Sequence, residues 1–164
     1  QSVGVNTLVM NAGDCFYEGK GANEEVLQLA CLQPSAKEDK LTGNAGSMVL
    51  DVTYGAFSML CTGDVEAEGE EMLVKKLRGK DYDVLKVAHH GSKNSTSQEF
   101  LKLIKPKIAL ISVGEDNSYG HPHAETVERL WEAECEVYQT SKMGAILLIT
   151  DGNSLTFSPI PFRL

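Results

Sequence analysis

Long apolar runs are absent from this sequence of 164 residues. The longest, Ile108–Val113 and Ala145–Ile149, are far shorter than the ~20 residues that a transmembrane helix needs, and we interpret them as buried strands. The chain begins with Gln1, and no charged and then apolar signal segment follows it. We therefore expect a piece of a longer protein, whose membrane context this segment leaves open.

Closely spaced cysteines are also absent. None of the four cysteines stands in the C-x-x-C spacing that is typical of a zinc clip or a redox centre. Cys31 and Cys61 stand inside apolar stretches. We therefore expect them to be free thiols that pack in a core.

Positive charge is scarce, because 23 acidic residues outnumber 15 lysines and arginines and the net charge is -8. An acidic chain repels polyanions on average, so its bulk charge gives no support to non-specific nucleic-acid binding. A bound metal ion could reverse this locally. The sequence has no internal repeat and no low-complexity tract, and its length predicts one domain over residues 1–164.

Apolar patterning predicts strands first and then strands that alternate with helices, which is typical of an α/β sheet with helices on its faces. A Gly-rich stretch, Gly13–Gly21, separates the first two expected strands. The helix over Glu66–Leu77 has its acids early and its bases late, as the helix dipole favours. The expected strands are Val5–Met10, Val26–Leu32, Ser47–Tyr54, Ala56–Thr62, Asp83–Ala88, Ile108–Val113, Val137–Thr140, Ala145–Thr150 and Ser154–Ser158; the other helices are Ser97–Ile104 and Ala124–Ala133.

Three polar clusters each follow an expected strand, at 62–64, 89–92 and 119–123. Open α/β sheets bind ligands at the carboxyl ends of their strands, so this repetition is informative. Taken alone, Gly63-Asp64 is more often a simple turn. All four histidines fall in the second and third clusters, which favours a functional interpretation over loop histidines that happen to be exposed.

Adjacent histidines at a strand end are expected to point to opposite sides. One of His89 and His90 could then bind metal while the other faces substrate. His121 could be a ligand or an acid/base group, whereas His123 directly precedes a helix and is better explained as part of the helix start. The segment 44–47, Asn-Ala-Gly-Ser, is by default a turn ahead of a strand.

Four elements together resemble the C-terminal domain of the ComEC family of bacterial competence proteins, which take up DNA. They are Thr-Gly-Asp at 62–64, Lys-Val-Ala-His-His-Gly-Ser at 86–92, Tyr-Gly-His-Pro at 119–122 after Ile-Ser-Val-Gly at 111–114, and Asn44-x-x-Ser47. They occur in the right order and spacing, over about residues 40 to 150.

The resemblance implies the C-terminal half of a metallo-β-lactamase-like fold, a four-layer αββα sandwich with its site at the rim. It implies that Asp64 bridges two metal ions and that His90 is a histidine ligand. His89 would face substrate or share in ligation, and His121 would support the metal ligands or act as an acid/base group. Asn44, where many relatives carry a histidine, and Ser92 would line the site.

The sequence also departs from the family pattern. The first metal motif, His-x-His-x-Asp-His, is absent, and His-x-His occurs only at 121–123. In the parent fold this motif belongs to the N-terminal half, so we expect it upstream of Gln1. The chain would then hold an incomplete site for divalent metal, and histidine and carboxylate ligands suit zinc or manganese equally.

The resemblance predicts metal-dependent phosphodiester hydrolysis, with the non-transported DNA strand as substrate. We expect the isolated chain to be inactive and to hold metal weakly. The partners implied are DNA, the transmembrane channel portion of the same polypeptide and possible homo-oligomers, because a truncated sandwich exposes apolar surface. The implied location is a soluble domain of a plasma-membrane protein, with the extracytoplasmic side favoured.

Two other hypotheses remain open at this stage. One is a structural or interaction half-domain whose site holds no metal. The other is a hydrolase of the same fold that acts on another phosphoester or on a small acyl substrate. The sequence upstream of Gln1 separates them, since the missing motif would restore the enzyme.

Overall fold

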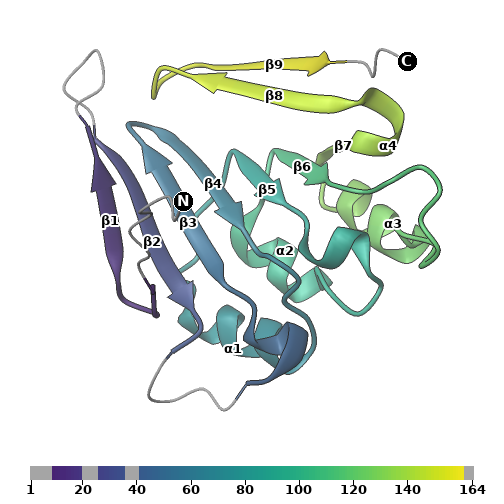
Figure 1. The fold of residues 1–164 in the computed structure, drawn as a ribbon, viewed down its shortest axis with the longest axis horizontal. Helices are drawn as coiled ribbons and strands as arrows, with labels where there is room; N and C mark the ends of the chain where they lie inside the picture. Colours follow the sequence, from purple (N-terminus) through teal and green to yellow (C-terminus); the bar gives the residue numbers. More distant parts are fainter. Residues whose placement is uncertain (1–8, 20–25, 36–40, 161–164) are drawn as a thin grey trace, which may run out of the picture.

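A computed structural model describes residues 9–19, 26–35 and 41–160. Its main element is a seven-stranded sheet in which the strands stand side by side in chain order, β1 to β7 (Figure 1). The first four strands pair antiparallel and the last four pair parallel. The strands are β1 Cys15–Glu18, β2 Leu27–Gln33, β3 Val49–Tyr54, β4 Phe57–Cys61, β5 Val84–Lys86, β6 Ile108–Ile111 and β7 Glu136–Gln139.

The parallel half is built from three crossovers, each through one helix: α1 Glu68–Lys76, α2 Gln98–Ile104 and α3 Ala124–Glu132. Such crossovers are almost always right-handed, so successive neighbours place their helices on the same face. The burial of the strand residues agrees with helices on one face only. Leu60 and Ile111 are fully buried, whereas Met59 and Leu110, which precede them in the same strands, are half-buried. The core therefore lies between the helices and one face of the sheet.

Local sequence explains where α2 begins and ends. The Ser97 hydroxyl accepts the N–H of Phe100 at 3.2 Å, which caps the first turn as a serine at this position commonly does. At the other end Lys105 adopts the left-handed conformation, and Pro106 follows and cannot continue the helix. Phe100, Leu101 and Ile104 fill the core from this helix.

A separate two-stranded hairpin, β8 Ala145–Thr150 and β9 Leu155–Ile160, follows the short helix α4 Thr140–Met143 and runs across the top of Figure 1. The Gly152 carbonyl in its turn accepts the N–H groups of Ala56 and Phe57 at 2.7 and 3.1 Å. The rings of Tyr138 and Phe157 lie 4.2 Å apart. The hairpin is thus attached both to the β3–β4 turn and to β7.

The α/β prediction is confirmed, with a large mixed sheet and helices at the expected places, and the expected hairpin at Tyr54-Gly55 is β3–β4. The prediction for Val5–Met10 lies mostly outside the described residues, and Val9 and Met10 are not in a strand. The prediction that the Gly-rich stretch Gly13–Gly21 only connects two strands is wrong, because it contains β1. All four residues of β1 are exposed, so it shows none of the alternation by which a half-buried strand is recognised.

Among the described residues, no helix combines the length and the apolar character needed to cross a membrane.

Candidate functional site

The parallel pairing of β4, β5 and β6 brings their carboxyl ends to one edge of the sheet. The loops that leave this edge carry the three polar clusters found in the sequence. The loop after β4 is tied to its neighbour, since the Gly63 carbonyl accepts the His89 N–H at 3.1 Å and the Lys86 ammonium at 3.1 Å. The clusters therefore lie next to one another, as the strand-end argument predicts.

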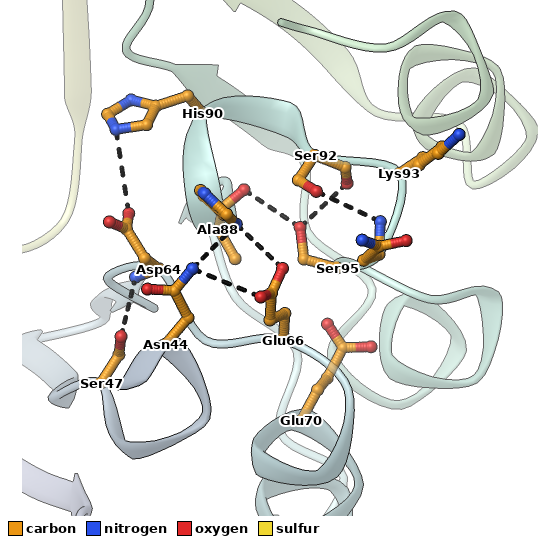
Figure 2. A network of polar contacts seen from close by, with 12 residues as sticks. Asn44, Ser47, Asp64, Glu66, Glu70, Ala88, His90, Ser92, Lys93 and Ser95 are labelled. Carbon is orange, nitrogen blue, oxygen red and sulfur yellow. Dashed lines mark hydrogen bonds and ion pairs between the residues drawn. The ribbon is translucent and has the colours of Figure 1, made fainter. Parts of the chain in front are cut away.

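Asp64 and His90 face each other across this edge, with 3.9 Å between Asp64 Oδ1 and His90 Nε2 (Figure 2). His90 Nδ1 lies 2.6 Å from the Ser112 carbonyl oxygen, which can only accept, so Nδ1 carries the proton. In a neutral ring, Nε2 then carries a lone pair that is available to a metal ion between it and the Asp64 carboxylate. Metal-binding histidines commonly donate their other ring N–H to a carbonyl or carboxylate in this way.

His89 is held by a residue that sequence reasoning missed. Its Nδ1 lies 2.9 Å from Glu66 Oε2, and the Asn44 amide donates to Glu66 Oε1 at 3.3 Å. Asn44 Nδ2 is also 3.4 Å from His89 Nδ1, but the shorter contact to Glu66 decides that Nδ1 donates to the carboxylate. In a neutral ring, Nε2 is then the acceptor of His89.

The sequence does not single out Glu66 as a site residue, because a simpler explanation accounts for a glutamate at this position. An acid at the expected start of a helix suits the helix dipole, and this alone accounts for a glutamate there. The helix begins two residues later, at Glu68. Only its position two residues after Asp64, in the same loop, could have distinguished Glu66 from the other acids of this segment.

The expectation that the two histidines point to opposite sides of a strand is wrong, because the strand has ended. β5 stops at Lys86, and His89 (φ 45°) and His90 (φ 53°) both adopt the left-handed conformation. This conformation costs a residue with a side chain roughly 1 kcal/mol or more. The two ring centroids lie 6.4 Å apart, and both rings lie near His121, at 5.4 and 6.5 Å.

His121 lies among the other histidines, and burial together with the neighbouring His123, His89 and His90 holds the pKa of its ring below the ordinary value. This favours a neutral imidazole near pH 7. His123 has a structural role, because its Nδ1 accepts the Lys93 N–H at 3.2 Å, at the position just before α3. That agrees with its interpretation as part of the helix start.

Ser92 differs from the other expected site residues. It is only 4% exposed, and its hydroxyl accepts the Asn94 N–H at 3.3 Å. Its carbonyl accepts the hydroxyls of Ser95 and Thr126. Its polar atoms thus stabilise the turn between η2 (Ala88–Gly91) and α2.

The fit of this site to a metal ion is partial. Two ligands that are each about 2.1 Å from one ion are about 3.4 Å apart at a tetrahedral angle. The 3.9 Å between Asp64 and His90 is close to that value. Within the ranges that the structure describes, however, no group of three or more histidine, cysteine, aspartate or glutamate side chains is arranged to hold a metal. Asp64 and His90 therefore fit two positions around an ion, fewer than a catalytic zinc requires.

Comparison with known sequences gives the family. The chain is 39% identical over 135 residues, 82% of its length, to ComE operon protein 3 of Bacillus subtilis. It is 37% identical over 138 residues to competence protein ComA of Neisseria gonorrhoeae, and 42% identical over 103 residues to recombination protein 2 of Haemophilus influenzae. The chain is homologous to the ComEC competence proteins.

No family model matches this ComEC homologue. It spans 17%, 20% and 13% of the lengths of these three relatives, respectively. The comparison therefore confirms the resemblance drawn from the motifs for a segment of those proteins, and not for their whole length.

Proposed function

We propose that this chain is part of a metal-dependent phosphodiesterase, a nuclease that acts on the non-transported strand during DNA uptake. The observation that carries the proposal is the pair at the sheet edge. Asp64 Oδ1 faces the free Nε2 of His90, whose other nitrogen is engaged by the Ser112 carbonyl. The homology to competence proteins supports a role in DNA uptake.

Asp64 and His90 would hold a divalent ion, and their oxygen and imidazole donors suit zinc or manganese. When bound, such an ion supplies hydroxide near neutral pH by lowering the pKa of a coordinated water. The other ligands would come from an upstream His-x-His-x-Asp-His motif, in the first half of a metallo-β-lactamase-like αββα sandwich. The chain alone would then bind metal weakly and be inactive.

The other polar side chains of the candidate site have proposed roles that follow from their contacts. Glu66 holds the His89 ring by Nδ1, which leaves Nε2 as an acceptor toward substrate. Burial lowers the pKa of His121, which favours a neutral ring that can accept a proton. Asn44 holds Glu66 and leaves the carboxylate less free to turn away.

The wider setting is also part of the proposal. We place this segment in a soluble domain of a bacterial plasma-membrane protein, on the extracytoplasmic side, beside the transmembrane channel portion of the same polypeptide and in contact with DNA. Homo-oligomers of the isolated chain are expected too. Leu147, Ile149 and Ile160 of the β8–β9 hairpin are 42%, 57% and 49% exposed, and several exposed apolar residues on one small element favour association.

Those apolar residues also favour a second candidate, an interaction half-domain without catalysis. Metal binding discriminates between the two. Calorimetric titration with Mn²⁺ or Zn²⁺ should give weak binding to the chain and none to Asp64→Asn or His90→Gln. The matched control is Asp81→Asn, which removes a carboxylate that is 69% exposed and lies outside the site.

A longer polypeptide that includes the upstream motif should hydrolyse DNA with the metal, and the same two variants should abolish this activity. If Asp64→Asn bound metal as tightly as the unmodified chain, the proposed site would be wrong. The interaction half-domain would then be the better description.

A further inference from the structure

A pocket of about 200 Å³ opens directly beside His90, on the side of the loop that follows β6. Its walls are mostly uncharged and none of them is acidic. The lining residues are His90, Val113, Gly114, Asn117, Tyr119 and His121. Two of the three histidines grouped at the sheet edge thus form one wall of a separate, largely apolar hollow.

Tyr119 is the outer wall of this pocket, and 78% of it is exposed. A single exposed aromatic residue is ordinary on a protein surface. This one differs because its ring lies nearly parallel to the His121 ring, at an interplanar angle of 24° and a centroid distance of 5.9 Å. One face of the Tyr119 ring is therefore directed toward His121, and both residues line the same pocket as the candidate metal ligand His90.

The loop that carries Tyr119 is held in place by one side chain. The Asn117 amide donates to the carbonyls of Gly114 and His121 at 3.0 and 2.7 Å, and its oxygen accepts the His121 N–H at 2.8 Å. Three bonds from Asn117 close the loop around Tyr119. A loop whose backbone is ordered beforehand loses less entropy when one of its residues binds a ligand.

We propose that this pocket is a nucleobase subsite, in which Tyr119 stacks on a base that flanks the phosphodiester held at Asp64 and His90. This inference rests on the proposed function and names what the site recognises beyond the phosphate. A neutral, flat, aromatic ligand suits the apolar and uncharged walls. Base–aromatic stacking does not depend on sequence, because every base has a π-face.

The charge of the chain limits where its affinity for DNA can come from. With a net charge of -8, the chain repels a polyanion on average, so bulk electrostatics gives no affinity for DNA. A contact to the base is independent of that repulsion. Stacking at Tyr119 would therefore give the site affinity that the acidic surface does not provide.

The test compares two single-stranded hexamers that have the same backbone and charge: hexathymidylate, and a hexamer whose sugars carry no base. Each is titrated into the ¹⁵N-labelled chain with Zn²⁺, which is diamagnetic, and dissociation constants are taken from chemical-shift changes. Hexathymidylate should bind more tightly by at least about fivefold, the low end for one base–aromatic stack. Tyr119→Ala should abolish this preference, whereas Tyr119→Phe should keep it.

Trp131→Ala is the matched control, because Trp131 is 63% exposed and lies on α3, outside the pocket; it should keep the preference. Equal affinity of the unmodified chain for both hexamers would overturn the subsite, and so would equal weakening of both by Tyr119→Ala. If the baseless hexamer still bound and Asp64→Asn abolished that binding, the proposed function would stand without the subsite. Failure of both hexamers to bind would overturn the subsite, and the calorimetric titration with metal would then decide the proposed function by itself.

Discussion

The contact between Glu66 and His89 allows a quantitative prediction about the site. Glu66→Ala removes the acceptor of the His89 Nδ1–H at 2.9 Å and leaves His89 in a left-handed backbone conformation without its partner. Glu66→Gln keeps an oxygen that can accept the same proton but removes the charge. The two variants therefore separate the effect of the hydrogen bond from that of the carboxylate charge.

The coupling free energy between Glu66 and His89 can be estimated from how deeply the two side chains are buried. A hydrogen bond to a charged group contributes a net stabilisation of about 1.5 to 3 kcal/mol, whereas exposed ion pairs contribute about 0.2 to 1 kcal/mol. The His89 and Glu66 side chains are 26% and 24% exposed, so the pair lies between these limits and nearer the lower one. We expect a coupling free energy of about 1 kcal/mol.

A double-mutant cycle with Glu66→Ala, His89→Ala and the double variant, followed by urea denaturation, measures this coupling. Nitrogen chemical shifts of His89 should report the Nδ1–H form in the unmodified chain and in Glu66→Gln, and a mixture of tautomers in Glu66→Ala. The control cycle uses Asp81 and Lys105, whose side chains are 69% and 68% exposed with 3.8 Å between charges; its coupling should be near zero. A Glu66–His89 coupling no larger than that of this control, with no change of tautomer, would refute the reasoning.

Three further predictions concern packing at two glycines, a buried carboxylate that accepts backbone N–H groups, and the titration of a histidine. Gly69→Ala should destabilise the chain by about 1 to 3 kcal/mol in urea denaturation, because an added Cβ would lie 2.1 Å from the Ala45 carbonyl oxygen. Gly114→Ala, with nothing within 4 Å of the added Cβ, should change stability by less than about 0.5 kcal/mol. Glu70→Ala should cost about 2 to 4 kcal/mol by the same assay, because the buried carboxylate accepts two backbone N–H groups at the turn before α2, and Glu70→Gln should cost less. The His121 ring should titrate below the ordinary histidine pKa of about 6.5 when followed by NMR. Its contribution to the free energy of unfolding should be complete above about pH 6.5 and should be lost as the pH falls through the lowered pKa. The reason is that the unfolded chain takes up the proton at a higher pH than the folded chain does.

The positions of Asp64 and His90 could be predicted from the sequence because they depend on topology. Each follows a strand of the parallel half, and parallel neighbours bring their carboxyl ends to one edge. Strand order therefore predicted that the loops carrying these residues meet, whereas the choice of Asp64 and His90 as the pair came from the resemblance to the ComEC family. The 3.9 Å between their side chains agrees with that expectation.

The partners of the histidines could not be predicted in the same way. His90 forms a hydrogen bond with the Ser112 carbonyl. Every residue has such a backbone group, so the sequence cannot identify this partner. The left-handed backbone at His89 and His90 was missed because the sequence is that of a strand end, where side chains alternate. Here Gly91 (φ 84°) continues the left-handed turn, and an added Cβ at Gly91 would lie 2.6 Å from Pro122. The close approach of Pro122 therefore leaves room only for a glycine at position 91, next to the two left-handed histidines.

Lys86 shows how the loops of the site are held together. It is the last residue of β5 and stands inside the histidine motif, yet its ammonium turns back to the Gly63 carbonyl at 3.1 Å. Burial lowers its pKa, against the opposing effect of the nearby Asp64 charge. The same carbonyl accepts the His89 N–H, so one backbone oxygen joins the Asp64 loop to the histidine loop. The two loops are thus joined at the Gly63 carbonyl, and Asp64 and His90 face each other from them without a direct hydrogen bond.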